Sequence, residues 1–410
     1  MLPPEFIIPD YGAGRPMGTT IANVPATIAR LFDVPFNGLP PLPESHWRPL
    51  GNPKRIVLLI LDALGRNLLE EHPHHWAAVR GRAAVDKIIT SVFPSTTVTC
   101  LSSLWTGHAP SQHALVSLFM LFPEYATVGQ MLGLSPRFGD YPDALVEAGL
   151  KPEEFLPVPS LPQQLATHAI PTHSFKPKSI IQSALSKMHD RGVKKQHGSV
   201  SFADLLGQMT AVLEEEPSAP LFLSGYWPTI DTLSHAYTPH HPIVEAELQT
   251  LFYQIEQFLL RPLSPSARQD TVLLIVADHG QIPYTTPHVA VPTDPALQDL
   301  LLFRGAGEAR APYLYARQGQ QEALLAYLRQ RYEKELFAFP SAELLEMGLF
   351  GPPPYPPELS RRLGDVIALM RDGRLWLNDA KDDYLTTKFR AMHGGLTAAE
   401  MFVPWLGVPL

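Results

Sequence analysis

Two apolar segments end in side chains that can hold a divalent metal ion. Asp62 closes the run RIVLLILD, and the adjacent pair Asp278 and His279 closes TVLLIVAD and precedes a glycine. In open α/β sheets, ligands bind at the carboxyl ends of the strands. These three side chains are therefore candidate site residues. A helix N-cap is the alternative role for Asp62, and a structural contact is the alternative for the Asp–His pair.

Three further candidates lie in two polar segments. Asp231 and His235 are four residues apart in DTLSH, so on a helical turn they would face the same way and could share one ion. An ion pair on a helix is the alternative. His393 precedes two glycines, which permit close approach of the backbone. Together the three Asp and three His residues suit two zinc-type ions, which could stabilise the attacking and leaving oxygens of an in-line displacement.

A hydroxyl nucleophile is available in the segment SVFPSTTVTCLSSLWTG. Pro94 and Ser95 break the chain, and a helix can begin at Thr96 or Thr97. A hydroxyl at that point would lie beside free N–H groups at the positive end of the helix, where an anion is stabilised. A simple N-cap is the alternative role for either threonine.

The elements that must position these residues alternate between strand and helix. Uninterrupted apolar runs predict buried strands at 55–62, 221–226 and 271–278. Helical spacing of apolar residues is present at 65–79, 97–104, 202–215 and 241–260. The alternation predicts an α/β fold with a mostly parallel central sheet flanked by helices.

A different pattern begins after residue 283. A strand at 311–316, a helix at 320–334 and a strand at 336–339 predict a small inserted α+β cap. We therefore expect a catalytic core formed by 1–284 and 385–410, with the cap at 285–384.

Composition limits the classes of partner. The 410 residues are 45% hydrophobic and 18% charged, with a formal net charge of −8, so a globular protein is expected and no nucleic-acid polymer or membrane partner is favoured. Cys100 is the single cysteine, which excludes an intrachain disulfide and a zinc site built from cysteines. The sequence shows neither a signal peptide nor a long apolar span, and a cytoplasmic protein is expected.

The ordered set ILDALG, FPSTT…LWTG, DTLSH, ADHG and MHGG resembles the alkaline phosphatase superfamily. Within it, the set is most similar to the branch of type I phosphodiesterases and nucleotide pyrophosphatases. The motifs cover nearly the whole chain. The resemblance implies two zinc ions, one held by Asp231, His235 and His393, and the other held by Asp62, Asp278 and His279 together with the nucleophile.

The resemblance also points to the nucleophile, which in these proteins lies ten residues before the glycine of a Thr-Gly pair. That glycine is Gly107 here, which points to Thr97, with Thr96 as the fallback. The segment after Thr97 lacks the x-Pro-x-Arg continuation of sulfatases. A phosphate-binding Asn of nucleotide pyrophosphatases is also missing, because Ser117 to Phe119 occupy its region.

We therefore expect a metal-dependent phosphoric ester hydrolase, of the phosphodiesterase or nucleotide pyrophosphatase type. It would act on a small phosphate ester through a phospho-threonine at a two-zinc site; manganese or iron could occupy the same ligands. Phosphomonoesterase, phosphonate hydrolase, phosphoryl transferase or mutase, and a non-catalytic binding relative are the alternatives. Phe119, Tyr226 and Trp227 could bind a substrate base by stacking, with core packing as the alternative.

Several histidines lie outside these motifs. His72, His74 and His75 crowd a predicted helix end, and His240 and His241 lie in a Pro-rich turn. We expect surface roles for all five.

Overall fold

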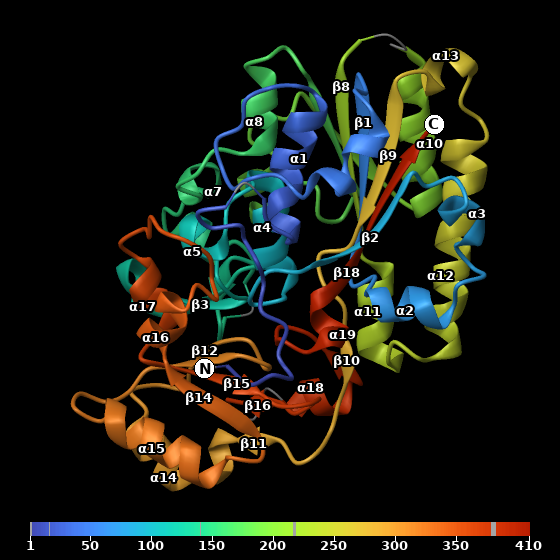
Figure 1. Ribbon diagram of the computed structural model, residues 1–410. Helices are drawn as coiled ribbons and strands as arrows, with labels where there is room; N and C mark the ends of the chain where they lie inside the picture. The colour runs from blue at the N-terminus through green and yellow to red at the C-terminus, as the bar shows by residue number, and fades with distance from the viewer. Residues whose placement is uncertain (1, 16, 140, 216–218, 379–382) are drawn as a thin grey trace.

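A seven-stranded sheet forms the centre of the larger part of the molecule (Figure 1). The computed structural model describes residues 2–15, 17–139, 141–215, 219–378 and 383–410. In spatial order the strands are β2 (Val85–Thr90), β18 (Phe402–Pro409), β9 (Thr271–Val276), β1 (Arg55–Leu61), β8 (Leu221–Trp227), β6 (Thr172–Pro177) and β7 (Lys195–Ser199). Strand β18 runs antiparallel to both of its neighbours, and the remaining neighbours pair in parallel.

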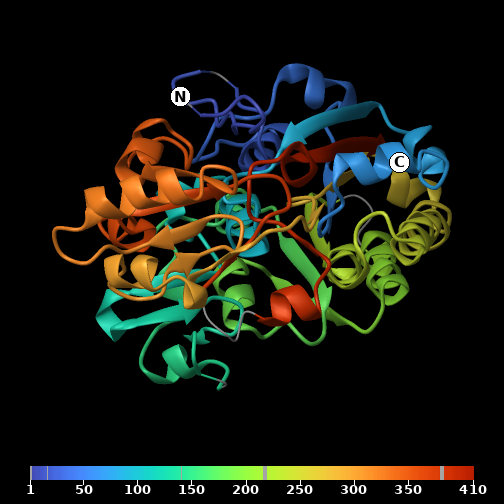
Figure 2. The same ribbon diagram turned by 90° about the horizontal axis from the view of Figure 1, so that it is seen from below.

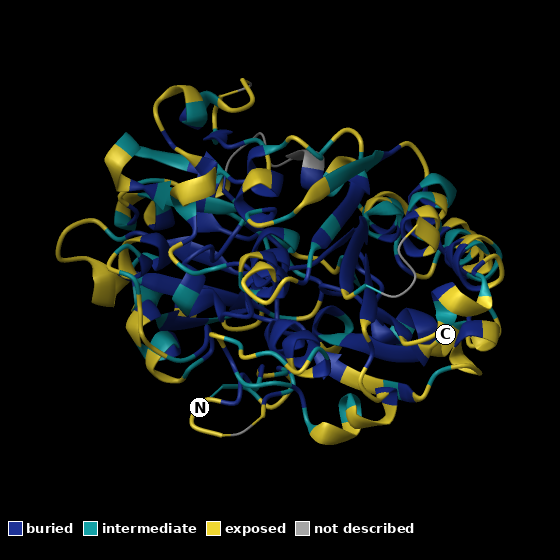
Figure 3. Cartoon of the chain, turned by 90° about the horizontal axis from the view of Figure 1, so that it is seen from above, coloured by how far each residue is buried: buried dark blue, intermediate teal, exposed yellow. Residues whose placement is uncertain are grey.

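Helices cover both faces of this sheet. Helices α1 (Val24–Leu31) and α4 (Thr97–Thr106) lie on one side, and α10 (Phe202–Glu215) and α12 (Pro242–Ile255) lie on the other (Figure 1). Every residue of β1 and β9 is buried, as Figure 3 shows for the centre of the molecule. Burial on both faces explains why the two strands read as uninterrupted apolar runs. The predicted α/β fold with a mostly parallel sheet is confirmed.

A second seven-stranded sheet lies beside the first (Figure 2). Its spatial order is β14 (Leu336–Pro340), β15 (Val366–Met370), β13 (Pro312–Leu314), β12 (Ala306–Gly307), β3 (Phe119–Phe122), β4 (Thr127–Gln130) and β5 (Ser135–Pro136). All its strands pair in antiparallel fashion, and α15 (Gln321–Arg331) packs on β14.

This second sheet is assembled from two distant parts of the chain. The pairing of Gly307 with Phe119 joins strands of the predicted cap, 285–384, to the segment 119–136. Residues 379–382 of the predicted cap lie outside the described residues. The cap bounds themselves stay a prediction, and the sheet shows that the cap strands pair with a segment of the predicted core.

Two predicted helices differ in detail from the structure. The helix predicted over 65–79 is interrupted, because α2 (Arg66–Glu71) ends before Pro73 and α3 (Ala77–Arg80) follows. Proline has no N–H to continue a helix and clashes with the preceding turn. The segment predicted over 241–260 forms α12 and then a π-helical turn at Glu256–Leu260.

Over the described residues, no helix has the length and apolar character needed to cross a bilayer.

Candidate active site

Three of the predicted residues meet at the carboxyl edge of the central sheet. Asp62 follows β1, and Asp278 and His279 follow the neighbouring parallel strand β9. His279 Nε2 lies 3.5 Å from Asp62 Oδ1 and 3.5 Å from Asp278 Oδ2. The three side chains are buried, and together they form a group whose geometry could hold one metal ion.

A second group joins the other three predicted residues. Asp231 and His235 lie on α11 (Thr229–Tyr237), and His393 follows β17 (Ala391–Met392). Asp231 Oδ1 lies 3.3 Å from His235 Nε2 and 3.7 Å from His393 Nε2. Gly394 has a φ of +109°, and a Cβ there would come within 3.0 Å of Glu308. The glycine after His393 is therefore required both by backbone conformation and by space.

The two groups are adjacent, and a threonine hydroxyl lies at one of them. The rings of His279 and His393 stack with centroids 3.9 Å apart. Thr97, the first residue of α4, places its Oγ1 3.2 Å from His279 Nε2. Thr96 is the N-cap residue of the same helix, and its side chain hydrogen-bonds to Glu308. The structure therefore directs Thr97, and not Thr96, toward the Asp62 group.

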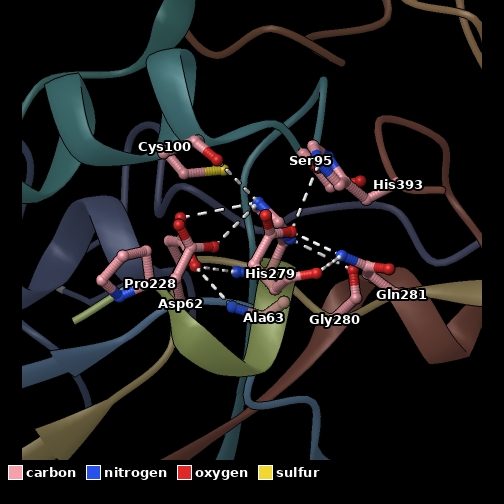
Figure 4. A network of polar contacts seen from close by, with 12 residues as sticks. Asp62, Ala63, Ser95, Cys100, Pro228, His279, Gly280, Gln281 and His393 are labelled. Atoms are coloured by element: carbon pink, nitrogen blue, oxygen red, sulfur yellow. Dashed lines mark hydrogen bonds and ion pairs between the residues drawn. The ribbon is translucent and has the colours of Figure 1, made fainter. Parts of the chain in front are cut away.

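Backbone carbonyls fix the orientation of all three imidazoles. His279 Nδ1 lies 3.1 Å from the Gly280 carbonyl, and His393 Nδ1 lies 3.0 Å from the Ser95 carbonyl (Figure 4). His235 Nδ1 lies 2.8 Å from the Ala391 carbonyl. With Nδ1–H donating to a carbonyl, each Nε2 carries a free electron pair and faces a carboxylate. This arrangement is typical of histidines that bind a metal ion.

The carboxylates of the first group are held but not saturated. Tyr226 donates its hydroxyl to Asp62 Oδ2. The N–H groups of Ala63 and His279 donate to Asp278 Oδ1 at 3.1 and 3.0 Å. Asp62 Oδ1 and Asp278 Oδ2 have no hydrogen-bond partner in the described structure. Buried oxygens without a partner are costly, and both face His279 Nε2, so a cation bound among them fits the donor set.

Burial also shifts the titration of these groups. It raises the pKa of Asp62 well above its usual range, and the nearby charges of Asp278 and Asp231 add to the shift. It raises the pKa of Asp278 to about 6. It lowers the pKa of His279 to about 4 and that of His393 to about 3. Crowded carboxyl groups among neutral imidazoles are the electrostatic setting in which a bound divalent ion is favoured.

A cavity of about 370 Å³ opens over Thr97 and the second group, and residues of the second sheet also line it. The core contributes Thr96, Thr97, Asp231, His235 and His393 to its lining. Apolar side chains also line it, among them Phe119, Leu132, Trp376, Leu385, Phe389 and Met392. Further polar side chains in the lining include Gln130, Arg137, Glu308 and Asn378.

The three predicted aromatic residues have different surroundings. Phe119 lines the cavity, and the Arg137 guanidinium lies 4.2 Å from the centre of its ring. Tyr226 is buried and supports Asp62 through its hydroxyl. Trp227 packs against Phe202, with ring centroids 5.7 Å apart. A substrate-binding role for the three residues stays a prediction.

Glu308 was not identified from the sequence, although it lies beside the nucleophile segment. Its side chain is buried and accepts a hydrogen bond of 2.6 Å from the Leu118 N–H. Burial raises its pKa to about 7, against the opposing effect of the hydrogen bonds from Leu118, Thr96 and Ser117. The local sequence GAGEAR carries no motif that would have identified Glu308, because its neighbours in space come from 96–118.

Comparisons with known proteins identify the family and similar folds. The family model for type I phosphodiesterase / nucleotide pyrophosphatase matches residues 56–396. Murine ectonucleotide pyrophosphatase / phosphodiesterase 5 has a similar fold, with a TM-score of 0.64 and 16% identity over 86% of this chain and 87% of that one. Phosphonoacetate hydrolase from Sinorhizobium meliloti 1021, in complex with phosphonoformate, also has a similar fold. Its TM-score is 0.60, with 15% identity over 87% of this chain and 90% of that one.

No curated protein matches the sequence. At these identities the two solved structures show a common fold, and the family model, which spans most of the chain, shows the family. The chain therefore belongs to the type I phosphodiesterase/nucleotide pyrophosphatase family, a family of metal-dependent hydrolases of phosphoric esters.

Proposed function

We propose that the protein hydrolyses small phosphodiesters or nucleotide-type pyrophosphates through a phospho-threonine at Thr97, at a site for two zinc ions. The observation that carries the proposal is the position of Thr97 Oγ1, 3.2 Å from the His279 Nε2 that also faces Asp62 and Asp278. A hydroxyl next to one of two adjacent ligand groups is the arrangement that nucleophilic phosphoryl transfer needs.

Each of the two groups of Asp and His residues would hold one of the two ions. Asp62, Asp278 and His279 would hold one ion, with Thr97 completing its coordination. Asp231, His235 and His393 would hold the other. When bound, the two cations supply positive charge that favours the ionised Thr97 hydroxyl and offsets the negative charge that develops on the phosphoryl oxygens. The mixed imidazole and carboxylate donors favour zinc.

The residues of the chain then carry out a double displacement. Thr97 releases its hydroxyl proton to solvent and Oγ1 attacks phosphorus. An Oγ1–P bond forms, and the bond between phosphorus and the leaving oxygen breaks, with the electron pair departing on that oxygen, which takes up a proton from solvent. Because α4 begins at Thr97, the free N–H groups of its first turn would be available to stabilise the phosphoryl oxygens. A water molecule next attacks phosphorus, the Oγ1–P bond breaks, and Thr97 regains its proton.

The cavity supports a substrate with an apolar or aromatic leaving group. Its lining includes Phe119, Trp376 and Phe389, and aromatic side chains can stack on a planar ring. Murine ectonucleotide pyrophosphatase / phosphodiesterase 5 has been solved as an inactive threonine-to-alanine variant in complex with AMP. That description supports both a catalytic threonine and a nucleotide-type ligand for this chain.

Phosphonates form the second candidate substrate class. The fold shared with phosphonoacetate hydrolase favours it, as does the absence of an Asn among Ser117, Leu118 and Phe119. For the phosphodiester or pyrophosphate proposal, the partner is a small phosphate ester. The cavity of about 370 Å³ fits a molecule of that class.

A cytoplasmic location stays a prediction.

The experiment that tests the proposal compares hydrolysis of bis-p-nitrophenyl phosphate and p-nitrophenyl phosphate, with metal content determined on the same preparation. About two zinc ions per chain at this site and faster turnover of the diester are expected. Faster turnover of the monoester would favour a phosphatase, and product formation that requires an added acceptor would favour a transferase or mutase. No turnover of either ester by zinc- or manganese-loaded protein would overturn the proposal.

A further inference from the structure

A third cluster of potential metal ligands lies away from the active site. His72 and His75 belong to the connection between α2 and α3, and Glu245 lies in the first turn of α12. Helix α12 packs against α11, and Figure 1 labels α2 in the same region of the molecule. Because His75 and Glu245 are 170 residues apart in the chain, this contact exists only in the folded protein.

The three side chains converge on one point. Glu245 Oε1 lies 2.9 Å from His75 Nε2 and 3.3 Å from His72 Nδ1. All three potential ligand atoms lie within 4.8 Å of one another. In tetrahedral zinc sites with bonds of about 2.0–2.1 Å, neighbouring ligand atoms are about 3.3 Å apart. The two separations from Glu245 Oε1, 2.9 and 3.3 Å, lie close to that value.

The chain between the two histidines is suited to this convergence. His72 is the C-cap residue of α2, and Pro73 prevents the helix from continuing. After this break, the His75 side chain contacts Glu245 on α12. The two imidazoles present different nitrogens, Nδ1 of His72 and Nε2 of His75, to the same carboxylate oxygen. The side chains of His72 and His75 are 19% and 9% exposed, against 37% for Glu245, so the cluster is largely shielded but remains open on one side.

We propose that His72, His75 and Glu245 form a binding site for a divalent transition-metal ion of the zinc class, separate from the active-site ions. Two imidazoles and one carboxylate are a ligand set that zinc uses, with a water molecule in the remaining position. A bound ion would connect the α2–α3 segment to α12. Since α12 packs against α11, the helix that carries Asp231 and His235, the site would stabilise the core on the side of the catalytic helix.

The alternative is a pair of hydrogen bonds from the two imidazoles to Glu245, with no ion. The variant Glu245→Gln separates the two cases. It keeps an oxygen that accepts hydrogen bonds, but it removes the negative charge that a metal ligand needs. His74→Ala is the matched control, because the His74 ring contacts His75 at a centroid distance of 3.9 Å but lies outside the ligand set.

The test measures bound zinc after equilibration of the full-length protein with a zinc buffer. Wild type and His74→Ala are expected to retain one more zinc ion per chain than Glu245→Gln and the double variant His72→Ala/His75→Ala. The difference between variants is the readout, so the result does not depend on how many ions the active site holds. Equal zinc content in all four proteins would overturn the proposal, and loss of the ion in His74→Ala would overturn the assigned ligand set.

A second readout covers the case in which a variant is destabilised. Zinc is expected to raise the Tm of wild type and His74→Ala more than that of Glu245→Gln, while the Tm values in chelator stay close. Hydrolysis of the nitrophenyl esters is expected to change by less than about twofold in Glu245→Gln, because none of the three residues belongs to the active site. An equal zinc-dependent rise in Tm in Glu245→Gln and wild type would contradict the proposal.

Discussion

Arg310 and Glu400 form a buried, bidentate ion pair that connects the second sheet to the catalytic loops. Arg310 Nε and Nη2 donate to the two carboxylate oxygens of Glu400 at 2.9 Å each, and both side chains are 0% exposed. Glu400 also accepts from the Gly395 N–H at 2.8 Å, and its carbonyl accepts from the Gly280 N–H at 2.8 Å. The pair therefore joins the connection between β12 and β13, where Arg310 lies, to the loops that carry His393 and His279.

Removal of Arg310 is expected to destabilise the protein and to weaken the site. Arg310→Ala leaves the buried Glu400 charge without an opposite charge, which costs about 3–5 kcal/mol in the free energy of unfolding. Arg261→Ala, which breaks a solvent-exposed pair with Glu256, should cost at most about 1 kcal/mol. Denaturant unfolding of both variants in the presence of zinc measures the difference. Equal effects would show that the buried pair does not stabilise the fold.

Thr97→Ala is expected to lower kcat/KM by at least about 10³-fold, because the variant has no hydroxyl to form the covalent intermediate. Thr97→Ser should retain more activity than Thr97→Ala, since it keeps a hydroxyl. Thr96→Val tests the fallback nucleophile, and its effect should be smaller because the Thr96 side chain bonds to Glu308. Steady-state hydrolysis of the diester and mass spectrometry of acid-quenched protein check the assignment. A phosphorylated Thr96 would contradict it.

Tyr226→Phe is expected to weaken metal binding about 10–100-fold, because the phenol that orients Asp62 is lost. Tyr313→Phe is the matched control, since it also removes a buried hydroxyl, one that donates to the Val116 carbonyl at 2.7 Å. Zinc titration in competition with a chromophoric chelator measures both affinities. If the two variants lose the same affinity, the effect reports general destabilisation and not the support of Asp62.

Chelation is expected to abolish hydrolysis and to lower Tm. Without a cation, the buried oxygens Asp62 Oδ1 and Asp278 Oδ2 have no partner within the described structure, so the folded state loses stability that metal binding supplies. Zinc added back should restore both activity and Tm, while magnesium should not, because imidazole ligands disfavour it. Calorimetry and diester hydrolysis on the same samples check this. Full activity in metal-free protein would exclude a metal-dependent reaction.

Glu308→Gln is expected to stabilise the protein increasingly as pH rises. Burial raises the Glu308 pKa from 4.5 to about 7, so the folded protein retains a proton that the unfolded chain releases. Wild-type stability therefore falls between these two pH values, by up to about 3 kcal/mol. The glutamine variant lacks this titration, and its advantage over wild type should be larger at pH 8 than at pH 5. A pH-independent difference in unfolding free energy would show that Glu308 titrates normally.

Much of the candidate site could be predicted from the sequence because its candidate ligands follow recognisable elements. Asp62, Asp278 and His279 each follow an apolar run that is fully buried as a strand. Asp231 and His235 have the spacing of one helical turn, and α11 is helical over both residues. Strand burial and helix periodicity are local properties, so the sequence determines them directly.

The sequence did not determine which distant segments meet. The pairing of Phe119 with Gly307 joins the two parts of the second sheet and places Glu308 beside Thr96. His72 and His75, expected to have surface roles, instead face Glu245 on α12. Neither contact has a local sequence signal.

The physical reason is the difference between local and long-range interactions. Apolar periodicity, helix termini and the side chains after each strand are set by neighbours within a few residues, and these determined the α/β class and the candidate ligands. The convergence of Asp62, Asp231 and His393 on adjacent sites depends on packing between segments separated by more than one hundred residues. Only the tertiary structure decides that packing, because it follows from burial of the whole core and not from any single segment.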